Sequence, residues 1–283
     1  MNEKKSKKLI QEYLRSLDFP VNQKYGREEI KKSQTALLEM ALIVCSILEK
    51  YDIPYVITNG TLIGAALYEI FVPWDDDFDL FLFDDTYDQA MELLNAELPE
   101  HLLVHGEQND SRYFPAWNRV KNLNTIVKDS GLYNSDNRFL KYPCLSLDLY
   151  RFKKIKNSEV VLYKINEAMA FFSRKFQSGI IDIETYQSQI QKLNAQKNNF
   201  KKLRSEDIGI DNHDVFMFMV MLNKPLKYNE LFPLKRYLFE GHCFWGPSSS
   251  HALLSSLYGP NYKKIPEYSE RKSRLSEVHW IGS

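Results

Sequence analysis

Four aspartates stand within five positions of this 283-residue chain, at Asp75, Asp76, Asp77 and Asp79. They lead directly into the apolar run from Leu80 to Phe83. Aspartate is a poor strand former, yet at strand period Asp77 and Asp79 share one face of this predicted strand. Two carboxylates side by side on a buried strand repel each other and are costly to desolvate. A divalent cation offsets both costs, and the sequence therefore predicts a Mg²⁺ (or Mn²⁺) site with Asp75, Asp77 and Asp79 as ligands.

A turn precedes this acidic cluster at a spacing that adds to the prediction. The apolar run from Tyr55 to Thr58 ends at Asn59-Gly60-Thr61, and small residues suited to a short helix follow. A helix that begins after a Gly-Thr turn offers backbone amides and a dipole to a phosphate. Asn59, Gly60, Thr61 and Trp74 are therefore the candidate substrate-binding residues, beside a metal that bridges the phosphate. The simpler alternative is a solvated acidic turn, which the position between Trp74 and an apolar strand disfavours.

Two later segments place charged residues on predicted strands. Arg119 and Lys121 alternate with Val120, so both cations share a face that suits a phosphate or pyrophosphate; the alternative is a charged edge strand. Cys144 to Phe152 alternates clearly, with Asp148 in mid-strand on the face opposite the leucines. A carboxylate is unexpected there, so Asp148 is predicted to complete the metal site or to act as general base, rather than to cap a turn.

At these residues the chain resembles the LicD family of phosphorylcholine transferases, which is related to the fukutin proteins. The resemblance lies in Asn59 to Ala65 and Phe71 to Asp79, with looser likeness at Thr125 and in the Glu240-Gly241 and Tyr258-Gly259 segments. It implies a nucleotidyltransferase-like fold and transfer of a phosphoryl-alcohol group, commonly phosphocholine from CDP-choline, to a cell-surface glycan. One departure is Leu67, because the family usually has Arg shortly after the Gly-Ala.

These observations favour one enzymatic function over three alternatives. The expected catalytic residues are Asp77, Asp79 and Asp148, and the expected partners are a CDP-alcohol and a glycan acceptor, free or lipid-linked (teichoic acid, capsule or lipopolysaccharide precursor). A glycosyltransferase that holds a nucleotide sugar through Asp-x-Asp is the second hypothesis. A catalytically silent, glycan-binding member is the third. A nucleic-acid enzyme is disfavoured, because the formal net charge is zero and no basic stripe with interleaved aromatics occurs.

Composition predicts one large core in a reducing compartment. The chain is 44% hydrophobic, and its three cysteines have no paired motif, which fits neither a disulfide framework nor a zinc site. The basic N-terminus lacks the apolar segment of a signal peptide, and the apolar runs are too short to span a bilayer. The expected location is the cytoplasm, at most in peripheral contact with the inner face of the membrane.

The order of predicted elements indicates an α+β protein with a mixed sheet flanked by helices. The predicted divisions are a leader (1–28), a catalytic core (29–152), a basic helical insertion (153–205) and the C-terminal part of the core (206–283). Within the insertion, Phe171, Phe172 and Phe176 are expected to anchor the helices to the core. Its lysines are either a solvated face or a docking surface for anionic lipid. Val215 to Leu222 is expected to be helical.

Overall fold

The computed structural model describes residues 3–129, 139–204, 212–218 and 221–281. The described residues form a seven-stranded mixed sheet. Five of its strands lie in the order β1-β2-β6-β4-β3, β7 pairs with the distal part of β6, and β8 pairs with β7. The strands of this sheet are β1 (Tyr55–Ile57), β2 (Phe78–Phe83), β3 (Leu102–His105), β4 (Asn118–Asn122), β6 (Ser146–Lys156), β7 (Asp214–Met217) and β8 (Leu226–Lys227). Strands β2 and β6 are parallel and the other pairings are antiparallel. The predicted α+β class is confirmed.

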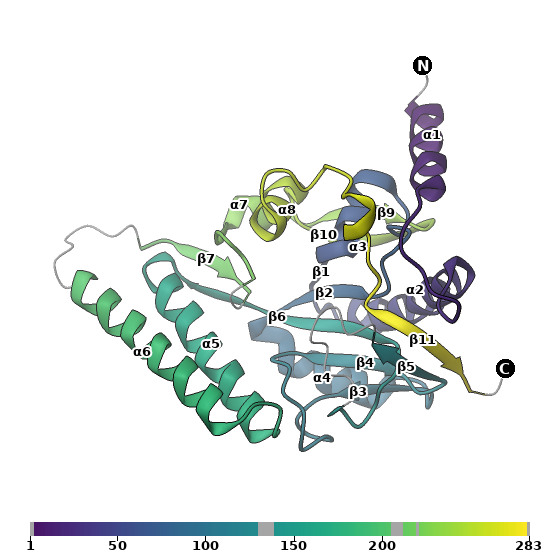
Figure 1. The fold of residues 1–283 in the computed structure, drawn as a ribbon. Coiled ribbons are helices and arrows are strands. Elements are labelled where there is room, and N and C mark those ends of the chain that lie inside the picture. The colour runs from purple at the N-terminus through teal and green to yellow at the C-terminus, as the bar shows by residue number, and fades with distance from the viewer. Residues whose placement is uncertain (1–2, 130–138, 205–211, 219–220, 282–283) are drawn as a thin grey trace.

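Helices cover one face of the sheet, and the carboxylates lie on the other. The long helices α2 (Arg27–Lys50) and α4 (Asp84–Glu97) lie behind the sheet in Figure 1. Arg151 of β6 forms ion pairs with Asp84 and Asp88 of α4, so the face of β6 that contains Arg151 points toward this helix. Asp148 is an odd number of residues away and therefore points to the opposite face. The leucines of β6 alternate with Asp148 as predicted, and they are fully buried.

Smaller elements complete the molecule around this sheet. Between β1 and β2 lie α3 (Asn59–Ile63) and one π-helical turn (Gly64–Tyr68). Two short sheets pair β9 with β10 and β5 with β11. The remaining bounds are α1 (Glu3–Ser16), β5 (Thr125–Asp129), α7 (Tyr228–Leu231), β9 (Lys235–Phe239), β10 (His242–Gly246), α8 (Ser250–Tyr258) and β11 (Leu275–Trp280). The predicted turn at Glu240-Gly241 joins β9 to β10, and both of its residues have positive φ.

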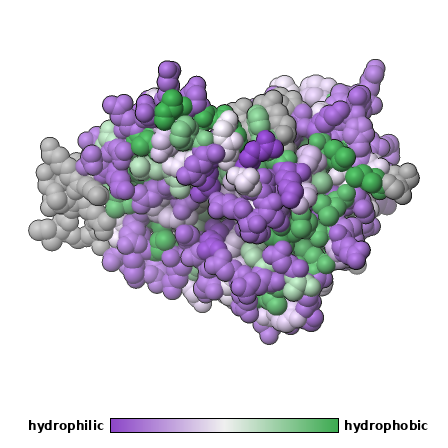
Figure 2. Space-filling view, turned by 90° about the horizontal axis from the view of Figure 1, so that it is seen from below, coloured by the Kyte–Doolittle hydropathy of each residue, from purple (hydrophilic) through white to green (hydrophobic). Residues whose placement is uncertain are grey.

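The predicted insertion is a helical hairpin of α5 (Val160–Gln177) and α6 (Ile183–Arg204), which projects from the sheet in Figure 1. Phe171 packs against Phe114 of the core, with ring centroids 6.5 Å apart, which confirms it as an anchor. Phe176 instead stacks on Tyr186 of α6 at 4.8 Å. Hydrophilic residues cover most of the surface seen in Figure 2. None of the described helices is long and apolar enough to cross a membrane. The predicted boundary between residues 205 and 206 lies outside the described residues.

The prediction of a helix over Val215 to Leu222 is wrong, because none of the described residues in this range is helical. Residues Asp214–Met217 form β7, which pairs antiparallel with Lys153 to Lys156 of β6. Phe216 packs its ring on Phe152 and Phe232. Strand β6 is long, and its distal part offers unpaired backbone groups that a second strand satisfies, so the sheet overrides the helical tendency of methionine. Residues 219–220 lie outside the described part.

Asp76 fastens the C-terminal segment to the start of β2. Its buried Oδ2 accepts hydrogen bonds from the Leu275 amide at 2.9 Å and from the Ser273 hydroxyl. Beyond this point β11 pairs with β5. Asp76 therefore has a structural role: it accepts two hydrogen bonds from residues almost 200 positions later in the chain, and it is not part of the cluster that could hold a metal.

Asp76→Ala is therefore expected to reduce the free energy of unfolding by about 1–3 kcal/mol, because the buried Leu275 amide loses its shorter hydrogen bond and the Ser273 hydroxyl loses its carboxylate acceptor. Asp76→Asn keeps an oxygen acceptor and is expected to lose less. Urea unfolding at pH 7.5 measures both variants, with the exposed Asp85→Asn of α4 as control. Equal stability of the Ala and Asn variants would contradict this anchoring role.

Candidate functional site

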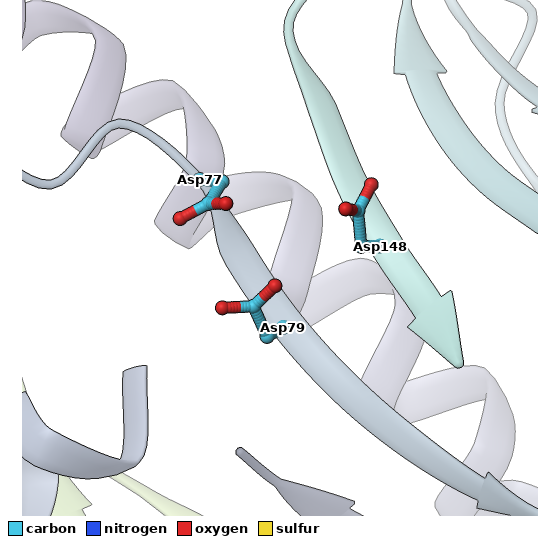
Figure 3. Close-up of side chains that lie close together, drawn as sticks. All are labelled: Asp77, Asp79 and Asp148. Carbon is cyan, nitrogen blue, oxygen red and sulfur yellow. The ribbon is translucent and has the colours of Figure 1, made fainter. Parts of the chain in front are cut away.

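Three carboxylates from two neighbouring strands form the centre of the candidate site. Ligand atoms of Asp77, Asp79 and Asp148 all lie within 4.8 Å of one another, and all three residues are buried. Figure 3 shows Asp77 and Asp79 along one strand and Asp148 on the adjacent strand. The parallel register of β2 and β6 places Asp79 directly beside Asp148, and Asp77 lies two residues earlier on the same face. The pairing of these strands thus brings together the three residues predicted to be catalytic.

A row of charged residues crosses the sheet at this level. Asp79 of β2 lies beside Asp148 of β6, which lies beside Arg119 of β4, and His105 of β3 follows. Arg119 Nε is 2.9 Å from Asp148 Oδ1, and both side chains are nearly buried. The Tyr150 hydroxyl lies 3.0 Å from an oxygen of Asp79 and 3.0 Å from an oxygen of Asp148. It has one proton and can therefore donate to one of the two carboxylates at a time.

Burial and repulsion between carboxylates raise the pKa of Asp79 within the trio. Burial, followed by the charge of Asp77, raises the pKa of Asp79 well above its ordinary value. Burial and the two adjacent carboxylates, Asp148 and Asp79, also raise the pKa of Tyr150, so its hydroxyl keeps its proton. The site therefore holds excess negative charge that is costly in the absence of a cation.

The oxygens of this cluster suit a metal ion. Among the described residues, no group donates a hydrogen bond to Asp77 Oδ1, Asp79 Oδ2 or the nearby amide oxygen Asn59 Oδ1, although all three atoms are buried. Buried acceptors without donors are rare in folded proteins. Carboxylate and amide oxygens are the donor set that Mg²⁺ and Mn²⁺ prefer. The residues present therefore fit a divalent cation between Asp77, Asp79 and Asp148.

Asp75 does not belong to this close trio. It is half-buried, and its carboxylate lies against Gly60, where any side chain larger than hydrogen would collide with it. Burial and Asp77 raise the pKa of Asp75. The sequence analysis named Asp75 as the third metal ligand, but the residue that joins Asp77 and Asp79 in the cluster is Asp148. A ligand role for Asp75 stays a prediction.

Gly60 and Thr61 lie beside the acidic cluster, as expected, but they belong to the first turn of α3 and not to a turn before it. Thr61 uses its hydroxyl to accept a 3.0 Å hydrogen bond from the Asp79 amide, and the Thr58 amide donates to the Asp79 carbonyl. These two bonds join the start of α3 to β2 and fix the direction of Asp79. Thr61 thereby positions the acidic strand, and binding of phosphate by Asn59, Gly60 and Thr61 stays a prediction.

Arg119 and Lys121 share one face of β4, but their surroundings differ. Arg119 pairs with Asp148 and lies 5.5 Å above the ring of Trp117. Lys121 is fully buried, and its ammonium donates to the Cys144 carbonyl at 3.2 Å. Burial, followed by the charge of Arg119, lowers the pKa of Lys121 to about 7. Both cations compensate negative charge inside the sheet, and their contact with substrate stays a prediction.

The sequence analysis missed two residues of the site. Tyr150 bridges the two strands, and strand period alone places it on the face of Asp148. Arg274, 195 positions after Asp79, has its Nη1 2.6 Å from Asp77 Oδ2. No local pattern marks Arg274, because it reaches the site only through the long return of the chain to β11. A cavity of about 290 Å³ adjoins these residues, and its lining includes Gly60, Trp74, Asp75, Tyr258, Lys272 and Arg274.

We expect Mg²⁺ or Mn²⁺ to raise the melting temperature of the protein, because binding to the folded state alone stabilises it. An ion at 10–100 times its dissociation constant adds roughly 1.4–2.7 kcal/mol, and each kcal/mol corresponds to about 2–4 °C. The raised pKa of Asp79 means that protons compete with the ion, so the shift should shrink as the pH falls from 8 to 5.5. Asp79→Asn should abolish the shift, whereas Asp85→Asn should keep it. An unchanged shift in Asp79→Asn would contradict the site.

Comparison with known proteins agrees with this geometry. Residues 52–249 match the family described as LicD/FKTN/FKRP, nucleotidyltransferase domain. The match covers the Gly-Thr turn, the acidic cluster, Asp148 and the β9–β10 hairpin. The chain is also 21% identical over 280 residues to the lipopolysaccharide cholinephosphotransferase LicD of Haemophilus influenzae, covering 88% of this chain and 97% of that protein. The chain therefore belongs to the LicD/FKTN/FKRP nucleotidyltransferase-domain family.

Proposed function

We propose that this protein transfers a phosphocholine group from CDP-choline, or a similar CDP-alcohol, to a hydroxyl of a cell-surface glycan in a reaction that requires Mg²⁺ or Mn²⁺. The observation that carries the proposal is the trio Asp77, Asp79 and Asp148, with acceptor oxygens that suit a metal. The name of the Haemophilus relative supports the choline phosphate and a lipopolysaccharide-type acceptor. Teichoic acid and capsule precursors are acceptors of the same chemical class.

In this proposal the trio holds a divalent cation, which neutralises charge on the donor phosphates and favours attack at phosphorus. Tyr150 and Thr61 fix the two strands, so the carboxylates keep their spacing during the reaction. Arg119 pairs with Asp148 and orients its carboxylate. Asn59, Gly60, Thr61 and Trp74 are assigned to the donor, because Gly60 and Trp74 line the cavity and Asn59 and Thr61 flank Gly60 in α3.

The reaction breaks one bond at phosphorus and forms another. The acceptor hydroxyl oxygen attacks the phosphorus of the phosphocholine group, and the bond to the bridging oxygen of CMP breaks with its electron pair on CMP. The proton of the hydroxyl passes to a carboxylate of the cluster, for which we assign Asp148, facing Asp79 across the two strands. The products are CMP and a glycan phosphodiester.

Two alternatives from the sequence analysis are less well supported. A glycosyltransferase also uses paired aspartates, but the family match is to a nucleotidyltransferase domain. A silent glycan-binding member would have no need of three clustered, buried carboxylates, of which Asp77 Oδ1 and Asp79 Oδ2 lack donors among the described residues.

We further place the reaction in the cytoplasm, at the inner face of the membrane when the acceptor is lipid-linked. The cysteines support a reducing compartment, because Cys45, Cys144 and Cys243 are all free and Cys45 and Cys144 are buried. The basic hairpin of α5 and α6 is the proposed surface for anionic lipid. Sedimentation with liposomes that contain acidic lipid tests this contact, and absence of co-sedimentation at low salt would exclude it.

The purified protein should release CMP from CDP-choline in the presence of Mg²⁺ and a glycan acceptor, and chelation should stop the release. Asp79→Asn should reduce the rate by at least about 100-fold, because a metal ligand is lost. Asp85→Asn is the matched surface control, and circular dichroism confirms that each variant folds. Wild-type release of UDP or GDP from sugar nucleotides, with none of CMP from CDP-choline, would favour the glycosyltransferase alternative. Unchanged CMP release in Asp79→Asn would contradict the metal assignment.

A further inference from the structure

The segment from Gly259 to Arg274, which we call the C-terminal strap, forms one side of the cavity beside the carboxylate trio. It lies beyond residues 52–249, the part of the chain that matches the family. The strap is held at its end, because Ser273 and Leu275 both donate hydrogen bonds to Asp76. Farther upstream, Arg271 donates to the Asp18 carbonyl at 2.6 Å and lies over the ring of Trp74. The backbone on both sides of Arg274 is thereby fixed.

Arg274 lies at the boundary between the trio and the cavity. Its Nη1 is 2.6 Å from Asp77 Oδ2, and its side chain is 42% exposed. The same residue lines the cavity, together with two other cations, Lys264 and Lys272, and three acidic residues, Asp75, Asp76 and Glu270. The guanidinium thus contacts a carboxylate of the trio and also faces a cavity.

A divalent cation and Arg274 compete for Asp77. Asp77 belongs to the trio that fits a metal, and the guanidinium contacts one of its two carboxylate oxygens. Metal binding places a second positive charge beside the guanidinium, and like charges at this distance repel. Ser273 and Leu275 hold the backbone around Arg274 to Asp76, so the contact between the guanidinium and Asp77 can be exchanged without movement of the strap.

The cavity offers Arg274 a replacement partner when a phosphate enters it. Arginine presents a planar fork of N–H donors that matches phosphate oxygens in two parallel hydrogen bonds. Two lysines of the strap, Lys264 and Lys272, lie on the same cavity and offset the charge of Glu270, which also lines it. Gly60 and Trp74, which are predicted to contact the donor, line the same cavity.

We propose that Arg274 exchanges Asp77 for a phosphate of the nucleotide donor, so that metal and donor each strengthen the binding of the other. This inference rests on the proposed function, since it takes the ligand of the cavity to be a nucleoside diphosphate. The ion pair opposes metal binding in the absence of donor. When a donor phosphate binds the guanidinium, Asp77 becomes available to the metal, and the affinity for the metal rises. By thermodynamic linkage, bound metal raises the affinity for the donor by the same factor.

Calorimetric titration of the full-length protein with Mn²⁺ and with CDP tests the exchange. Arg274→Gln should bind Mn²⁺ alone about 5-fold more tightly than wild type, and should bind CDP at saturating Mn²⁺ at least about 5-fold more weakly. The two changes have opposite signs, which a general loss of structure does not produce. Arg274→Lys keeps the charge without the fork and should fall between wild type and Arg274→Gln. Lys263→Gln, an exposed cation on the same strap, is the control and should match wild type.

The outcomes separate this inference from the proposed function. If wild type binds Mn²⁺ and CDP but Arg274→Gln matches it in both titrations, the exchange is overturned and the proposed function stands. Weakening of both ligands in Arg274→Gln and Arg274→Lys, at unchanged melting temperature, also overturns the exchange, because Arg274 would then only support the site. If wild type binds Mn²⁺ and no CDP, the nucleotide donor itself is overturned.

Discussion

Mutual repulsion among buried carboxylates is the constraint on which the rest of this structure depends. Four aspartates occur within five residues, and a fifth, Asp148, is brought beside them by the parallel pairing of β2 and β6. Removal of such groups from water disfavours their charged form, and each raises the cost for its neighbours. Burial together with Asp77 accordingly raises the pKa of Asp75, Asp76 and Asp79, to about 6 in the case of Asp76.

The chain meets this constraint by giving nearly every carboxylate a different partner. Asp76 accepts hydrogen bonds from the C-terminal segment, Asp77 pairs with Arg274, and Asp148 pairs with Arg119. Asp79 shares the hydroxyl of Tyr150 with Asp148. Asp77 Oδ1 and Asp79 Oδ2 still have no donor among the described residues. Ligand atoms of Asp77, Asp79 and Asp148 are close enough together to share one cation. Structural and chemical roles are thus divided among adjacent residues of one short segment.

The partners come from three distant parts of the chain, and this explains the arrangement of the fold. Arg119 comes from β4, Tyr150 from β6, and Arg274 from the strap that leads into β11. Strands β4 and β6 pair in the main sheet, while β11 pairs with β5, the strand next to β4 in sequence. The short sheet of β5 and β11 therefore does more than cover the core, because it fixes the strap that brings Arg274 to the acidic cluster.

Sequence by itself determined the elements whose periodicity is strong and the residues whose placement is local. Strand alternation put Asp77 with Asp79, and Asp148 opposite the leucines, because side chains on a strand alternate between its two faces. The Gly-Thr turn and the acidic cluster also identified the family. Tertiary structure alone decided which aspartates meet, since Asp148 enters the trio through strand register while Asp75 turns to Gly60. It also decided that residues 214–217 form a strand, that Lys121 is buried, and that Arg274 faces Asp77. These features depend on pairings between residues far apart in the chain, and no local pattern of residue types encodes such pairings.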